Sequence, residues 1–156
     1  ILLFDEIDDY RNAGKATLGI WVVSPAGLKA AQYLKETFGT PYELHYFGLD
    51  AVVDFDDNLF AGKNVLVIHQ QAAASAMAAM AEEAGAARVM TASWFMDKPE
   101  ARYENHVVLK EEDDLRDLAD NDNFDLILGD LYYRRALPNF HGQYVDFPHF
   151  AVSGRG

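Results

Sequence analysis

Two short, predominantly apolar runs constrain the fold of this chain more than any other feature. NVLVI occupies residues 64–68 and FDLIL occupies residues 124–128. A strand with one wet face alternates apolar and polar residues, whereas a continuous apolar run is typical of a strand buried on both faces. Strands of that kind occur mainly in parallel sheets that helices cover on both sides. The two runs therefore predict an α/β protein.

Other segments extend this pattern into alternating strands and helices. Further strands are expected at Thr17–Val23, Tyr42–Phe47, Arg88–Ala92, His106–Leu109 and Gln143–Phe147. Helices are expected after Ser24-Pro25 as far as Gly39, from about Gln71 to Ala84 before Gly85, at Glu111–Ala119 and at Leu131–Leu137, with a short one within Ala51–Phe60.

The predicted architecture is a three-layer, Rossmann-like parallel sheet with helices on both faces. Residues 60–156 would form the main domain, with strand order 3-2-1-4-5, and residues 1–55 would form a partial βαβ segment of, or leading from, a neighbouring domain. The acidic, turn-rich stretch Gly48–Lys63 is the best linker candidate. Because the chain begins at Ile1 rather than Met and ends in SGRG, we expect it to be an internal piece of a longer polypeptide.

Charge and composition exclude several functions. The formal net charge is −12, without a compensating basic stripe, so nucleic acid and anionic membranes are poor partners. The acidic surface is either simply solvated or a docking face for a basic redox partner. With no cysteine, this stretch cannot hold a thiolate-bound cluster. It has no apolar run of about 18 residues, and we expect a cytoplasmic protein.

Familiar catalytic and nucleotide-binding motifs are missing. The residues after the first buried strand are HQQAAASAM, without the glycines that let a backbone approach a pyrophosphate. The sequence also contains no GxxxxGK[ST] and no GxSxG. Classical dinucleotide binding, a P-loop and a nucleophile elbow are therefore disfavoured or excluded.

Candidate site residues follow the two buried strands, where the switch point of such a sheet binds ligands. His69 and Gln70 come after the first strand, and Asp130 follows the second. His69 could donate a proton, ligate a metal or cap a strand end. Gln70 and its neighbour Gln71 could bind a polar ligand or cap the next helix. Asp130 could bind a cation or serve as an N-cap.

Three weaker candidates lie elsewhere. His141 and His149 flank the last strand and could converge with His69 on a transition metal, although the spacing matches no compact motif. The pair Arg134-Arg135 could hold an anion or pair with the acidic surface. The stretch Trp94-Phe95-Met96 is either a greasy loop or half of an interdomain contact.

Three stretches together resemble the component 1 family of nitrogenase-like oxidoreductases. They are SPAGLKAAQYLKETFGTPY at residues 24–42, GKNVLVIHQQAAASAMAAMAEEAGAARVMTASWF at residues 62–95, and NFDLILGD with LPNFHGQYVDFPHFAVSGRG at residues 123–130 and 137–156. The order and spacing of these stretches carry the resemblance. It implies a divergent member built from Rossmann-like domains.

The resemblance also implies a function for the full-length protein. It would be an oxidoreductase subunit that pairs with a homologous subunit or neighbouring domain and takes electrons from an iron-protein donor. An iron–sulfur or related metal cluster would be present in the full-length protein and not be held by this piece alone, which would be inactive in isolation. His149 stands before Ser153-Gly154, much as a family histidine that touches the metal cofactor precedes an S-G pair.

On this basis we expect His69, Gln70, Asp130 and His149 to line the cofactor cleft, with His149 as the metal ligand. Two alternatives remain open at this point. One is a non-catalytic scaffold that assembles and hands over a metal cofactor. The other is a small-ligand binding module with a Rossmann-like fold.

Overall fold

A computed structural model describes residues 12, 15–17, 19–22, 25–45, 56–95, 97–99 and 102–154. The chain divides into two compact units, Ile1–Phe47 and Gly48–Gly156. Whether the two units are separate domains with boundaries at 1–55 and 60–156 stays a prediction.

The first unit contains a βαβ element. Strand β1 (Gly19–Val22) pairs in parallel with β2 (Tyr42–His45), and helix α1 (Pro25–Phe38) connects them. Leu28 and Ala31 are buried, as their helical spacing predicts, whereas Phe38 is exposed. Gly39 ends α1 with a φ of 71°, a left-handed conformation that residues with a side chain rarely adopt.

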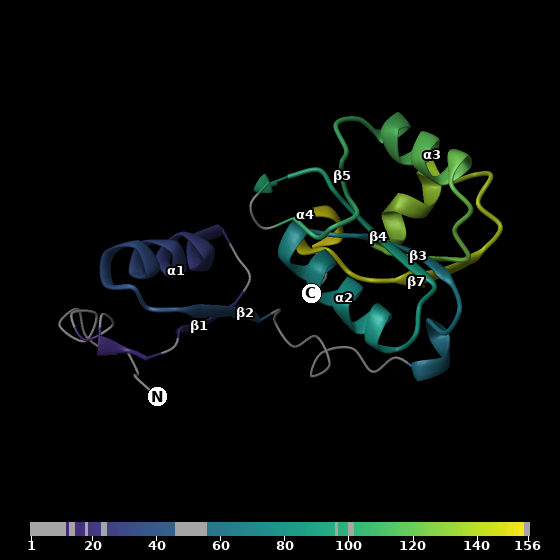
Figure 1. Ribbon diagram of the computed structural model, residues 1–156. Coiled ribbons are helices and arrows are strands. Elements are labelled where there is room, and N and C mark those ends of the chain that lie inside the picture. The colour runs from purple at the N-terminus through teal and green to yellow at the C-terminus, as the bar shows by residue number, and fades with distance from the viewer. Residues whose placement is uncertain are drawn as a thin grey trace. The chain divides into compact units, whose positions relative to one another are not determined.

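The second unit contains a five-stranded parallel sheet (Figure 1). Its strands are β3 (Asn64–Ile68), β4 (Arg88–Ser93), β5 (His106–Val108), β6 (Leu126–Gly129) and β7 (Gln143–Asp146). They lie in the order β5-β4-β3-β6-β7, and every neighbouring pair is parallel. Numbered within the unit, this is the predicted order 3-2-1-4-5, which is confirmed.

The apolar runs are continuous because their side chains point alternately into two separate cores. Val65 and Val67 face one core, in which helix α2 (Gln71–Glu83) packs. Leu66 and Ile68 face the other core, which contains residues of α3 (Glu112–Asn121) and of the 3-10 helix η5 (Leu131–Ala136). Figure 1 shows α2 and α3 on opposite sides of the strands. The protein is thus a three-layer, Rossmann-like α/β fold, as predicted.

Helix α2 meets the sheet mostly through alanine. Ala74, Ala78 and Ala81 are fully buried, and Met77 fills the space between them. Ala72, Ala73, Ala79 and Ala84 are half-buried, and Ala73 and Ala84 pack against the same core. After the helix Gly85 has a φ of 86°, which accounts for the stop predicted there.

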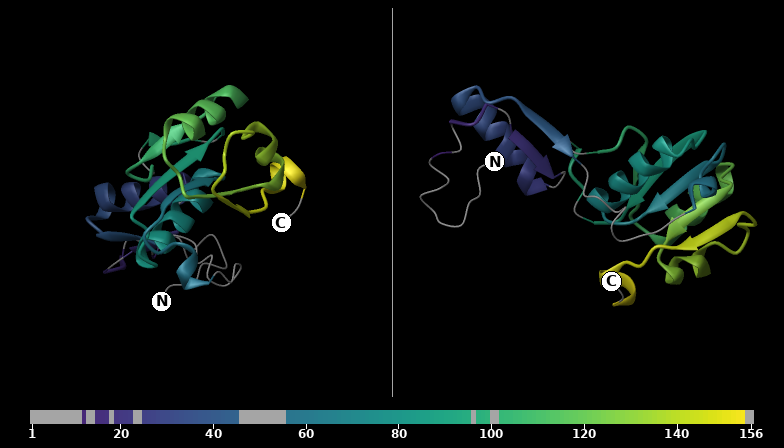
Figure 2. Two further views of the ribbon diagram at one scale, coloured as in Figure 1. Left: turned by 90° about the vertical axis from the view of Figure 1, so that its right-hand side faces the viewer. Right: turned by 90° about the horizontal axis from the view of Figure 1, so that it is seen from below.

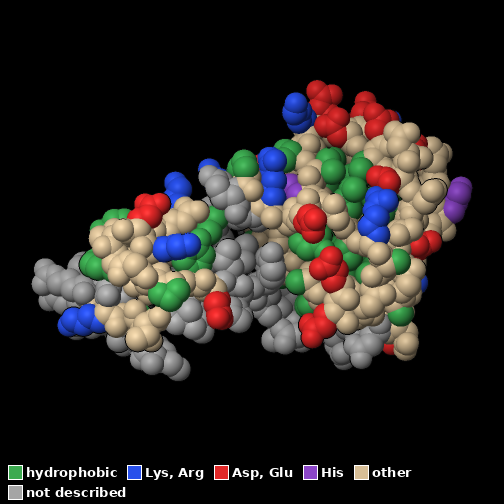
Figure 3. All heavy atoms as spheres, in the orientation of Figure 1, with side chains coloured by type: hydrophobic (Ala, Val, Ile, Leu, Met, Phe, Trp, Pro, Cys, Tyr) green, Lys and Arg blue, Asp and Glu red, His purple; other side chains and the backbone are tan. Residues whose placement is uncertain are grey.

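Helix α3 begins with a capping box, in which the side chains of Glu111 and Asp114 bond each other's backbone N–H groups. Asp114 accepts from the N–H of Lys110 at 2.7 Å and of Glu111 at 3.0 Å. The hydrogen bond from Lys110 is the main cause that lowers the pKa of Asp114. Figure 3 shows the acidic side chains gathered over α3. They lie at the positive end of the helix dipole, as expected.

Three elements differ from the sequence-based expectation. The segment after β6 is the 3-10 helix η5, which starts when the Asp130 side chain accepts the N–H of Tyr132. A short helix α4 (Phe150–Ser153) follows β7 and was not predicted; Figure 2 follows the chain from β7 into it, in yellow. Of the helix expected within residues 51–60, only the 3-10 turn η3 (Asp57–Leu59) lies in the described residues.

Candidate functional site

Three of the predicted site residues lie together at one edge of the sheet. His69 follows β3, Asp130 follows β6, and His149 comes shortly after β7. Because these strands are adjacent and parallel, their carboxyl ends meet at the same edge. The rings of His69 and His149 stack with their centroids 4.5 Å apart and their planes tilted by 33°.

The hydrogen bonds of His69 fix its tautomer. The backbone N–H of Gln70 donates to Nδ1 of His69 at 2.8 Å, so the proton must sit on Nε2. That Nε2–H then donates to the carbonyl of Pro148 at 2.9 Å. Burial lowers the pKa of His69, and the nearby His149 ring acts in the same direction. His69 is therefore neutral near pH 7 and ties the end of β3 to the segment after β7.

His149 is buried, with 3% of its surface exposed. Its Nδ1 atom is buried and has no hydrogen-bond partner among the residues that the structure describes. Burial also lowers the pKa of His149, which favours the neutral ring. When the proton sits on Nε2, the lone pair of Nδ1 can bind a metal or accept a hydrogen bond.

Asp130 acts as a fully buried clamp. Its Oδ1 accepts from the N–H of Tyr132 at 3.0 Å, and its Oδ2 accepts from the N–H of His149 at 2.9 Å and from the hydroxyl of Ser153. Its backbone carbonyl accepts the hydroxyl of Tyr144 at 2.7 Å. One residue thus joins the end of β6 to η5, to β7 and to α4. Asp130 therefore is the N-cap of η5, which was one of the two possibilities considered from the sequence. It also accepts the three other hydrogen bonds named above, from His149, Ser153 and Tyr144.

Two tyrosines next to Asp130 stay protonated. Burial, reinforced by the Asp130 charge, raises the pKa of Tyr133 to about 12. Burial likewise raises the pKa of Tyr144, which donates its proton to the Asp130 carbonyl. Both phenols are hydrogen-bond donors at neutral pH.

The two glutamines after His69 behave differently. The side chain of Gln70 is exposed and makes no capping hydrogen bond to α2. Gln71 is buried, and its amide bonds both backbone groups of Lys98, donating to the carbonyl at 2.8 Å and accepting from the N–H at 3.0 Å. Gln71 therefore straps the segment after β4 to the start of α2.

His141 does not join the other histidines. It precedes β7, so it lies toward the amino ends of the parallel strands, whereas His69 and His149 lie at the carboxyl ends. In the described part of the chain, no three His, Asp or Glu side chains are grouped so as to hold a metal ion. The predicted three-histidine metal site is therefore not formed.

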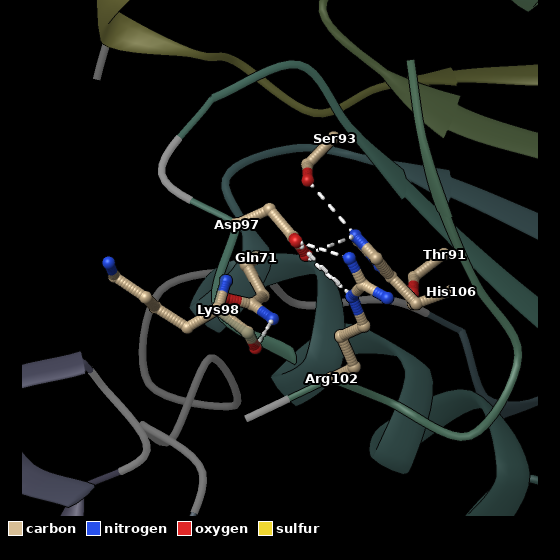
Figure 4. A network of polar contacts seen from close by, with 7 residues as sticks. All are labelled: Gln71, Thr91, Ser93, Asp97, Lys98, Arg102 and His106. Atoms are coloured by element: carbon tan, nitrogen blue, oxygen red, sulfur yellow. Dashed lines mark hydrogen bonds and ion pairs between the residues drawn. The ribbon is translucent and has the colours of Figure 1, made fainter. Parts of the chain in front are cut away.

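A buried polar network around His106 was missed from the sequence (Figure 4). Nδ1 of His106 lies 2.7 Å from the Thr91 hydroxyl, and Nε2 lies 3.1 Å from the Ser93 hydroxyl and 3.4 Å from Asp97. Asp97 in turn forms a two-pronged ion pair with Arg102. No sequence motif marks these residues. The contact between Asp97 and His106 is made across an irregular loop, and such contacts have no fixed spacing in a sequence.

This network does not form a nucleophilic triad. In such a triad the carboxylate and the serine bond opposite nitrogens of the histidine, whereas Asp97 and Ser93 both approach Nε2 here. The His106 side chain is 1% exposed and Ser93 is 1% exposed, so substrate cannot reach them. We assign the network a structural function, namely to hold β5 and the segment after β4 against the sheet.

A hollow of about 620 Å³ lies at the same carboxyl edge as the histidine pair. Residues from the segments after β4, β5, β6 and β7 line it. Trp94 and Tyr133 form part of its wall, with their rings stacked at a centroid distance of 4.8 Å. Trp94 and Phe95, considered from the sequence as a greasy loop or half of an interdomain contact, thus border a hollow of the size that binds small molecules, while Met96 lies outside the described residues.

These features define an α/β protein with a Rossmann-like parallel sheet and a candidate ligand edge. No protein-family model matches the sequence, and no curated protein matches it. Among solved structures, one described as "Nitrogenase Cp1 at pH 6.5" matches with a TM-score of 0.58 and 16% sequence identity over 96% of this chain. The chain spans 42% of the length of that protein.

At 16% identity this similarity shows the fold, which is nitrogenase-like. It agrees with the resemblance inferred from the sequence at the level of architecture. Among the described residues, no helix is long and apolar enough to cross a membrane.

Proposed function

We propose that this chain is part of a nitrogenase-like component 1 oxidoreductase subunit. The carboxyl edge of its sheet forms one wall of a metallocluster or substrate cleft, and electrons reach that cleft from a partner iron protein. A homologous subunit or a neighbouring domain supplies the opposite wall. The nitrogenase-like fold supports this proposal, because the neighbour with that fold is a nitrogenase component.

The single observation that carries the proposal is the orphaned nitrogen of His149. Leaving a buried polar atom without a partner costs roughly 1–3 kcal/mol, so such an atom calls for an explanation. A metal group would provide one, provided that the segment covering this buried nitrogen moves aside when the whole protein is assembled. His149 also stands where the family resemblance expects a histidine that touches the metal cofactor.

The residues present fit a metal group only in part. His149 offers one soft-to-borderline nitrogen ligand, and the described residues provide no set of three ligands around it. The remaining ligands would therefore come from outside this stretch, which has no cysteine. When bound, the group would supply the redox chemistry, while Asp130 fixes the backbone position of His149. His69 and the exposed Gln70 would form the rest of the rim.

The test is the iron content of the full-length protein purified under anaerobic conditions. We expect stoichiometric iron, and an electron paramagnetic resonance signal that changes in His149→Gln. The matched control is His141→Gln, an exposed histidine at the opposite edge, which should leave both unchanged. Iron-free full-length protein with a native fold would contradict the proposal.

The same preparation separates the catalytic function from the scaffold alternative. A scaffold would transfer its metal group to a partner protein without turning over a substrate. A reductase would instead consume electrons from an iron protein. The third alternative, a small-ligand binding module, is favoured by the hollow of about 620 Å³ and predicts ligand binding that is independent of iron.

A further inference from the structure

The hollow at the carboxyl edge has walls of an unusual composition for a surface depression. Phe95 and Tyr132 line it with 59% and 51% of their surfaces exposed, and Trp94 and Tyr133 add a stacked pair of rings. Leu115 and Ala136, which are buried, also contribute to its lining. Flat aromatic faces around a small volume are complementary to a flat aromatic guest.

Four charged side chains line the hollow, two of each sign, in a chain that is strongly acidic. Lys110 and Arg135 line it together with two acids, Glu111 and Glu112. The Glu111 side chain is engaged in the capping box of α3. The capping contact leaves Glu111 ionised, so the two cations and two carboxylates of the lining balance, and a preference for an anion rests on the position of Arg135.

Arg135 is held in place for binding. Its guanidinium lies 4.8 Å from the centre of the Tyr132 ring, and its Nε donates weakly to the Tyr132 carbonyl at 3.4 Å. Its outer N–H groups have no partner in the described part of the chain. A guanidinium that is already positioned on a ring binds a planar carboxylate or a sulfonate with two parallel hydrogen bonds and little further loss of entropy.

We propose that this hollow is a binding site for a small planar aromatic anion, stacked against the Trp94 and Tyr132 walls with its acidic group on Arg135. The protonated hydroxyl of Tyr133 provides a further hydrogen-bond donor nearby. The site lies on the η5 and α4 side of the edge and involves neither His69 nor His149. Its lining contains no proposed metal ligand, so binding there can be measured without iron, although the hollow shares the carboxyl edge with His149.

The experiment compares two dyes that share one ring system. Anilinonaphthalene sulfonate carries an acidic group, and phenylnaphthylamine lacks it; the fluorescence of both rises in an apolar site. With the full chain of 156 residues, we expect the sulfonate to bind about tenfold more tightly, and its affinity alone to fall with added salt.

Two variants locate the site. Arg135→Gln should weaken sulfonate binding about tenfold and leave the neutral dye unchanged. Its matched control is Arg134→Gln, because Arg134 lies over the ring of Tyr144 and does not line the hollow. Ala151→Phe should weaken both dyes, since Ala151 is exposed on the wall and a large side chain there occupies the space.

Three results would overturn the proposal: no saturable binding of the sulfonate, equal affinities for the two dyes, or equal effects of Arg135→Gln and Arg134→Gln. Far-ultraviolet circular dichroism of each variant checks that the fold is intact. Because Ala151 and both arginines are exposed, we expect these substitutions to leave the fold unchanged. Iron in the full-length protein bears on neither outcome, so this proposal and the proposed function can fail separately.

Discussion

The carboxylate of Asp130 accepts the backbone N–H of His149 at 2.9 Å, in a position from which water is excluded. These residues are 19 positions apart and follow different strands. The contact therefore fixes where the His149 ring lies at the carboxyl edge. Asp130 is a positioning residue: it acts on the candidate site through the backbone of its neighbour.

The first prediction concerns Asp130→Ala. This change leaves the N–H groups of Tyr132 and His149 and the hydroxyl of Ser153 without their acceptor. We expect the free energy of unfolding to fall by about 3 kcal/mol, measured by urea denaturation. Asp117→Ala is the control, because the Asp117 side chain is exposed, and it should change stability little. Equal effects of the two changes would show that the clamp contributes nothing.

The second prediction compares the adjacent glutamines. Gln71→Ala removes both hydrogen bonds to Lys98 and should lower the free energy of unfolding by about 1–2 kcal/mol. Amide exchange at Lys98 should become faster, because its N–H then faces water. Gln70→Ala, in the exposed neighbour, should change neither quantity. Unchanged exchange at Lys98 in Gln71→Ala would rule out the strap.

The third prediction is a loss of stability at mildly acidic pH. Burial lowers the pKa of His69, His106 and His149 below the ordinary value of 6.5. Near that pH the folded chain binds fewer protons than the unfolded chain, so unfolding becomes easier as the pH decreases. We expect stability to be full above pH 6.5 and to decline as the pH falls through the folded-state pKa values.

His106→Gln separates the contribution of the Figure 4 network. The His106 ring faces Thr91, Ser93 and Asp97, with the Arg102 charge behind Asp97. A glutamine cannot take up the proton, so part of the decline below pH 6.5 should disappear from the stability curve measured by thermal melting. His141→Gln should leave the curve as it is. A curve of unchanged shape in His106→Gln would contradict the assignment.

The fourth prediction concerns the turn before β7. A Cβ atom at Gly142 would lie 2.7 Å from the backbone oxygen of Asp125, which accepts the N–H of Gln143. Gly142→Ala should therefore displace the start of β7 and cost roughly 1–3 kcal/mol of unfolding free energy. The control is His141→Ala, because His141 is the exposed neighbouring residue, and this change should hardly alter the free energy of unfolding. If Gly142→Ala leaves the free energy of unfolding unchanged, the backbone around residue 142 can accommodate the Cβ atom and the prediction is wrong.

The sheet could be predicted from the sequence because local signals agree with the tertiary structure. Residues 65–68 are apolar throughout, and the structure buries their side chains alternately in two cores. The glycines at 39 and 85 end helices where the left-handed conformation is required. Each of these signals is contained within a few neighbouring residues.

The side-chain contacts could not be predicted in the same way. The sequence indicated that His69 and Asp130 share an edge of the sheet. It did not indicate that the Asp130 carboxylate accepts hydrogen bonds from Tyr132, His149 and Ser153. Helix α4 is too short to show a period. His106 meets Asp97, whose neighbour Lys98 is hydrogen-bonded to Gln71 of helix α2. Contacts of this kind depend on loop geometry, which no spacing rule describes.

Strand β5, at one border of the sheet, has only three residues. A border strand offers its unpaired N–H and C=O groups as a template on which another polypeptide can align, and the strength of that template grows with its length. An edge strand of three residues offers few backbone groups to which a strand of another molecule could bind. We therefore expect little fibril growth from this border of the sheet, which a light-scattering time course at increasing concentration measures directly.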